Sequence, residues 1–89
     1  MTDAERVLID LATVVARTFP DRDFPEVDGQ SRAFADLGLA SIDLVVLAER
    51  LELHYGKKLP FGTFLKSLRD RGADDVILGE LVAFLQRHV

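Results

Sequence analysis

Apolar residues recur at helical spacing through most of this chain, and no segment alternates apolar and polar residues for long enough to form a β-strand. The chain has 89 residues, which is enough for one domain and too few for two. Hydrophobic residues make up 48% and charged residues 29%, which is typical of a globular chain and not of a disordered one. The sequence therefore predicts a single all-α domain over residues 1–89.

The first helix is expected to begin after Thr2 and to end near Arg17 or Thr18. Thr2 and Glu5 have the spacing of a capping box, and Pro20 disfavours the helical conformation at the residue before it. One face carries the residues predicted to be buried, which are Ala4, Val7, Leu8, Leu11, Val14, Val15 and Thr18.

A long first loop should separate this helix from the second one. No period is sustained from residue 19 to residue 40, but the loop has apolar residues that could anchor it to the core: Phe24, Val27, Phe34, Leu37 and Leu39. The second helix is expected from Ser41 to Tyr55, with Gly56 as a left-handed stop. Its predicted core stripe, with Leu47 beside it, consists of Ile42, Val45, Ala48, Leu51 and Tyr55.

Two further helices complete the expected architecture. A short one should lie between Phe61 and Arg71 and end at Gly72, with its apolar face formed by Phe61, Phe64, Leu65 and Leu68. The last should follow Asp74 or Asp75 as its N-cap and bury Leu78, Leu81, Val82 and Leu85. The predicted fold is a four-helix bundle with a long first loop and a short third helix.

Composition excludes several classes of function. A net charge of −4 argues against nucleic acid as a partner, and the absence of cysteine excludes disulfides and thiolate metal sites. No apolar run approaches the ~20 residues of a membrane span, and the acidic start lacks the basic region of a signal peptide. His54 and His88 lack metal-ligand spacing, so no metal is expected. We therefore expect a cytoplasmic monomer that is not an enzyme.

Ser41 is the residue whose setting suggests chemistry. Gly38 permits a sharp turn before it, and the first turn of a helix offers free N–H groups and the positive end of the helix dipole. An anion attached to Ser41 would be stabilised there, and Asp43 lies where negative charge is favourable. A serine opening an apolar helix is more often a simple N-cap, but Leu44 is not the Glu or Gln that would complete a capping box.

The sequence Leu-Gly-x-x-Ser-Ile-Asp at residues 37–43 resembles the attachment site of acyl and peptidyl carrier proteins. Helix order, the long first loop, Leu59-Pro60 and Leu-Val-Ala-Phe-Leu at residues 81–85 extend the resemblance over the whole chain. In that family the serine is esterified by 4′-phosphopantetheine, whose terminal thiol carries the substrate. The resemblance implies that this chain is a discrete carrier with the cofactor on Ser41. It also implies three kinds of partner: a phosphopantetheinyl transferase, a loading enzyme (acyltransferase or adenylating enzyme), and condensing or tailoring enzymes.

The chain departs from the family pattern in ways that bear on its partners. Ala40 stands where fatty-acid carriers most often have Asp. The second helix is less acidic than in those carriers, and several apolar residues fall off its predicted core stripe: Leu44, Val46 and Leu53. These residues suggest a docking surface with more apolar contact, which favours polyketide or peptide pathways over primary fatty-acid synthesis. The expected partner contacts are Asp43, Leu44, Val46 and Glu49. The residues expected to hold the helix to the core, and to line any cleft for the cargo, are Ile42, Val45, Leu47 and Leu51.

Two other functions are considered. An unmodified helical interaction module that retains the carrier fold is the main alternative, and Ala40 supports it. A hydrolase using Ser41 would need His54 as its base, but that residue lies 13 positions along the same helix, roughly 20 Å away. The hydrolase is therefore rejected.

Overall fold

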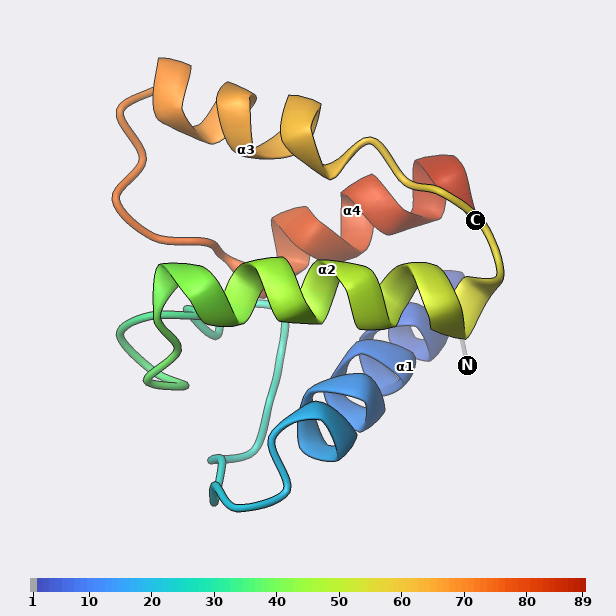
Figure 1. Cartoon of the computed structure of the whole chain (residues 1–89), viewed down its shortest axis with the longest axis vertical. Helices are drawn as coiled ribbons and strands as arrows, with labels where there is room; N and C mark the ends of the chain where they lie inside the picture. The colour runs from blue at the N-terminus through green and yellow to red at the C-terminus, as the bar shows by residue number, and fades with distance from the viewer. Residues whose placement is uncertain (1) are drawn as a thin grey trace.

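The computed structural model describes residues 2–89, and within them it contains four helices (Figure 1). The helices are α1 (Asp3–Thr18), α2 (Ser41–Tyr55), α3 (Phe61–Asp70) and α4 (Leu78–His88). α1 packs against both α2 and α4. The described residues contain no β-strand beyond one isolated bridge between Arg32 and Ile77. The all-α, four-helix fold with a long first loop and a short third helix is confirmed.

The ends of the first two helices follow the local sequence signals. The Thr2 hydroxyl accepts the Glu5 N–H at 3.1 Å, and the Glu5 carboxylate accepts the Thr2 N–H at 3.5 Å, so the predicted capping box is present. α1 ends at Thr18, two residues before Pro20. α2 ends at Gly56, whose φ of 68° lies in the left-handed region that glycine adopts without strain.

The core draws apolar side chains from all four helices and from the first loop. Its most deeply buried large residues are Leu11, Val15, Leu47, Leu51, Leu78 and Leu85. From the loop, Leu37 and Leu39 are buried, and Phe24, Val27 and Phe34 pack against the core while partly exposed. The predicted anchoring of the loop is confirmed. In α3, Leu68 is buried and Phe61, Phe64 and Leu65 are partly buried, as expected.

The predicted register of α2 is wrong at two positions. Ile42 is 67% exposed and Val45 is 50% exposed, so neither holds the helix to the core. The inward face instead consists of Leu44, Leu47, Ala48, Leu51 and Tyr55. The error has a simple cause: the first half of α2 is apolar on more than one side, so two stripes at helical spacing fit its sequence equally well.

The predicted N-cap of the last helix is also wrong. α4 begins at Leu78 with Ile77 as its N-cap, and Asp75 lies three residues before the helix. The Asp75 carboxylate instead accepts the backbone N–H groups of Phe34 and Ala35 at 2.9 and 3.0 Å. It therefore ties the segment between α3 and α4 to the first loop, about 40 residues earlier in the chain.

Backbone hydrogen bonds extend this attachment of the loop to the start of α4. The N–H groups of Leu78 and Gly79 donate to the carbonyls of Ser31 and Gly29 at 2.9 and 2.8 Å. A Cβ at Gly79 would lie 2.6 Å from the Gly29 carbonyl oxygen, so glycine is required for this close approach. The long loop is thus a docked part of the fold, and it sets the position of the turn that leads into α2.

Candidate functional site

Ser41 is the first residue of α2, and its side chain is exposed. Ala40 precedes it as the N-cap, with extended φ and ψ of −100° and 168° and a carbonyl that accepts the Leu44 N–H at 3.3 Å. Ser41 is therefore not the N-cap. Within residues 2–89 the exposed Ser41 hydroxyl makes no hydrogen bond.

The backbone around Ser41 is suited to an anion. As the first two residues of the helix, Ser41 and Ile42 have N–H groups with no carbonyl to pair with inside α2. These groups and the positive end of the helix dipole stabilise negative charge at this position. Gly38 has a φ of 71°, which allows the chain to turn sharply just before the helix. The local structure fits a phosphodiester on the Ser41 oxygen.

Asp43 holds the start of α2 in place. Its carboxylate accepts the Ala40 N–H at 2.8 Å and pairs with the Arg22 guanidinium at 3.0 Å. The hydrogen bond from the Ala40 backbone and then that from Arg22 lower the pKa of Asp43 below its ordinary value. Arg22 in turn lies 4.8 Å above the centre of the Phe19 ring. Sequence reasoning missed Arg22, because its partner is 21 residues away and no local pattern joins them.

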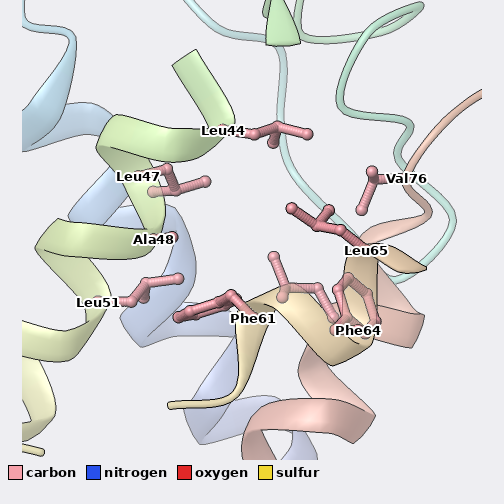
Figure 2. Close-up of a pocket in the computed structure, with 9 residues that line it drawn as sticks. Leu44, Leu47, Ala48, Leu51, Phe61, Phe64, Leu65 and Val76 are labelled. Carbon is pink, nitrogen blue, oxygen red and sulfur yellow. The ribbon is translucent and has the colours of Figure 1, made fainter. Parts of the chain in front are cut away.

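Ser41 lies at the edge of an open groove bounded by α2, α3 and the segment that joins α3 to α4. Leu44, Leu65 and Val76 line this groove, and they also line a smaller cavity between α2 and α3. The cavity is entirely walled by apolar residues and has a volume of ≈ 20 Å³. Figure 2 shows the α2 side chains Leu44, Leu47, Ala48 and Leu51 facing Phe61, Phe64 and Leu65 of α3 across it. An apolar path therefore leads from Ser41 into the space between these helices.

The structure separates the four predicted partner contacts into two pairs. Val46 and Glu49 are exposed on the outer side of α2. Asp43 is occupied by its internal hydrogen bonds, with 14% of its side chain exposed, and Leu44 is partly buried in the groove. Ile42 and Val45, which the predicted register had assigned to the core, are exposed instead, and Val45 lines the open groove beside Ser41.

Other kinds of site have little support in the described part of the chain. No group of three or more His, Cys, Asp or Glu side chains could hold a metal ion in residues 2–89. His54 lies beside Asp10, with 3.9 Å between Nε2 and the carboxylate, at the opposite end of α2 from Ser41. Over the same residues, none of the helices combines the length and apolar character needed to cross a membrane.

Comparison with known families agrees with the site. The family model described as phosphopantetheine attachment site matches residues 9–70, which include Ser41 and its surroundings and make up more than half of the chain. Neither a curated protein nor a solved structure was found to match. The chain belongs to the phosphopantetheine-attachment family, whose members are not catalytic themselves and carry a covalent 4′-phosphopantetheine for partner enzymes.

Proposed function

We propose that the 4′-phosphopantetheine is attached to Ser41 and that the domain formed by residues 1–89 shuttles an acyl or aminoacyl thioester between biosynthetic enzymes. One observation carries the proposal: an exposed hydroxyl with no hydrogen bond in residues 2–89 lies at the first residue of a helix, beside a largely apolar groove, within the part of the chain that matches the family. When bound, the cofactor supplies a terminal thiol that holds the cargo.

The chain itself contributes to attachment by exposing the Ser41 hydroxyl to the transferase. The hydroxyl oxygen would attack the phosphorus of coenzyme A that bears the pantetheine arm, the pyrophosphate P–O bond would break, and adenosine 3′,5′-bisphosphate would leave. The transferase would take the hydroxyl proton, because no base of this chain pairs with Ser41 in the described residues. The N–H groups of Ser41 and Ile42 would stabilise the phosphodiester charge. Asp43 keeps this first turn formed, because it caps Ala40 and is itself held by Arg22.

The space between α2 and α3 supports a role in holding the cargo. Its lining is apolar, so an aliphatic or aromatic chain would gain free energy by leaving water there. A volume of ≈ 20 Å³ holds about one water molecule, so α3 has to move away from α2 before a chain can enter. Phe61 and Phe64 are suited to such a movement, because both are only partly buried.

The outer surface of α2 supports a pathway of polyketide or peptide type over primary fatty-acid synthesis. Ile42, Val45 and Val46 expose 67%, 50% and 36% of their surface near Ser41. Asp43 is neutralised by Arg22, which leaves Glu49 as the exposed acidic residue among them. Such a surface favours close apolar contact with a partner over long-range attraction to a basic one. We propose Val46 and Glu49 as contacts for the transferase, the loading enzyme and the condensing or tailoring enzymes.

The mass of the intact protein tests the proposal. The apo protein is incubated with coenzyme A and a broad-specificity phosphopantetheinyl transferase, and the same reaction is run on Ser41→Ala and Ser67→Ala. Ser67 is the matched control, because it is an exposed serine within a helix. We expect one phosphopantetheine on the native protein and on Ser67→Ala, and none on Ser41→Ala. Absence of any gain from the folded native protein would contradict the proposal and favour an unmodified interaction module.

A further inference from the structure

Some basic residues of this acidic chain form ion pairs within the described residues, and others do not. Five of the 11 Lys and Arg residues pair with a carboxylate: Arg6, Arg22, Arg32, Lys66 and Arg71. Arg17 and Arg50 are both exposed, and neither forms an ion pair with any residue in the range 2–89. They come from different helices, yet they line one groove.

This α1–α2 basic groove is formed by Val14, Arg17 and Thr18 of α1 and by Arg50, Leu53 and His54 of α2, and it encloses ≈ 350 Å³. Leu53 is 73% exposed, the highest value among the large apolar residues that lie on the surface. An exposed leucine in the same groove as two guanidinium groups that form no ion pair within residues 2–89 offers both apolar contact and charge.

No carboxylate lines the α1–α2 basic groove, and the acidic residues nearby have other partners. Asp10 is the carboxylate closest to His54, and it already accepts the Tyr55 hydroxyl at 3.1 Å. Glu52 accepts the Leu59 N–H at 2.8 Å. Glu49 lines the adjoining groove, where Leu53 is again part of the wall.

The adjoining groove carries two lysines and two glutamates, Glu49 and Glu52, so it adds no net charge beside the α1–α2 basic groove. Lys57 and Lys58 line it, and neither forms an ion pair within the described residues. Leu53 lines both grooves, and of the two only the α1–α2 basic groove has no carboxylate in its wall. Arg50 lies in the C-terminal half of α2, and Lys57 and Lys58 follow its end. The helix dipole stabilises positive charge there.

We propose that the α1–α2 basic groove binds an acidic segment of a partner protein, which pairs its carboxylates with Arg17 and Arg50 and places an apolar side chain on Leu53. Guanidinium groups favour carboxylates because they can donate two parallel hydrogen bonds. A volume of ≈ 350 Å³ is large enough for a few side chains. Arg50 lies nine residues along α2 from Ser41, about 13 Å at 1.5 Å per residue, so this contact leaves the attachment site free.

An NMR titration of the isotopically labelled apo protein tests this proposal without the cofactor, so its outcome is independent of whether Ser41 is modified. The probe is a synthetic amphipathic peptide of Glu and Leu, and a peptide of the same pattern made of Lys and Leu is the control. We expect the acidic peptide alone to shift the amides of Arg17, Arg50 and Leu53, with a Kd below about 1 mM. Binding should weaken as salt is added.

Variants connect the binding to these residues. The double substitution Arg17→Gln with Arg50→Gln should weaken binding by about fivefold, as expected for the loss of two exposed ion pairs. Leu53→Ser should weaken it as well. Arg87→Gln is the matched control, since Arg87 is exposed, has no ion pair in the described residues and lies near the end of α4. The proposal is overturned if the acidic peptide does not bind, if it shifts other amides, or if the double variant binds equally well.

Discussion

Arg22 and Asp43 form a two-point ion pair across 21 residues of sequence, with nitrogen–oxygen distances of 3.0 and 3.5 Å. The same carboxylate accepts the N–H of Ala40, the residue before Ser41. The first loop and the first turn of α2 are thus held by one side chain. The start of the helix, and with it the position of the Ser41 hydroxyl, depends on a residue of the loop.

Arg22→Ala should slow attachment of phosphopantetheine while leaving the four helices formed. The reason is that Asp43 keeps its bond to Ala40 but loses the side chain that orients it. The measurement is the kcat/KM of the transferase reaction, followed by intact mass, together with the circular dichroism of the variant. Arg6→Ala is the control, because it removes an exposed ion pair near the start of α1. Equal rates for the two variants would show that Arg22 does not position the site.

Asp75 should make stability depend on acid pH. Partial burial alone would raise its pKa, but hydrogen bonds from the N–H groups of Phe34, Val76 and Ala35 outweigh this and lower the pKa below 3.8. The contribution of a carboxylate with a lowered pKa is present above its unfolded value and lost as the pH falls through the folded value. Asp75→Asn should therefore be less stable than the native protein at neutral pH, and the difference should shrink below about pH 4. Urea unfolding at several pH values measures it, and a difference independent of pH would contradict this account.

Tyr55 should titrate far above an ordinary tyrosine. Burial, and then the charge and hydrogen bond of Asp10, raise its pKa to about 12. Because Tyr55 is the only tyrosine and there is no tryptophan, an ultraviolet absorbance titration reports on it alone. A raised pKa contributes stability that is present below the unfolded value and lost as the pH rises through the folded one, so the fold should weaken between about pH 10 and 12. Tyr55→Phe should cost about 0.5–1.5 kcal/mol near neutral pH, and an unshifted titration would show that the hydroxyl is free.

Gly79→Ala should destabilise the protein by about 1–3 kcal/mol, because the new Cβ would lie 2.6 Å from the Gly29 carbonyl oxygen and both groups are backbone. Gly62→Ala is the matched control within α3, where a Cβ meets no atom within 4 Å. That substitution should be neutral or stabilise the protein by up to about 1 kcal/mol. Urea unfolding compares the two, and equal effects would mean that the loop is not held closely against α4.

Val46→Ser should raise the KM of the transferase with little effect on stability, since Val46 is 36% exposed on the outer side of α2. Ile9→Ser serves as the control, because Ile9 is 50% exposed on α1. Transferase kinetics and thermal unfolding are measured for both variants. If the two variants show the same KM as the native protein, Val46 is not a transferase contact.

Local signals in the sequence predicted most of the helices. The capping box of Thr2 and Glu5, the stop at Gly56 and the periodic apolar residues of α1 and α3 act over a few residues. They are found where they were expected, except that Ala4 is exposed. The attachment segment is local in the same sense, because a turn at Gly38 and a helix beginning at Ser41 require only neighbouring residues.

The tertiary structure decided what those signals left open. Two stripes of α2 were equally apolar, and only packing against α3 and the core selected Leu44, beside the expected Leu47, over Ile42 and Val45. Asp75 was predicted to cap the last helix, but its carboxylate accepts hydrogen bonds from Phe34 and Ala35 of the first loop. By itself the sequence determined where α1, α2 and α3 form and which serine opens α2, since these depend on short-range contacts. Which side of α2 faces solvent, and which residues hold the Ser41 turn in place, depend on contacts between residues far apart in the chain.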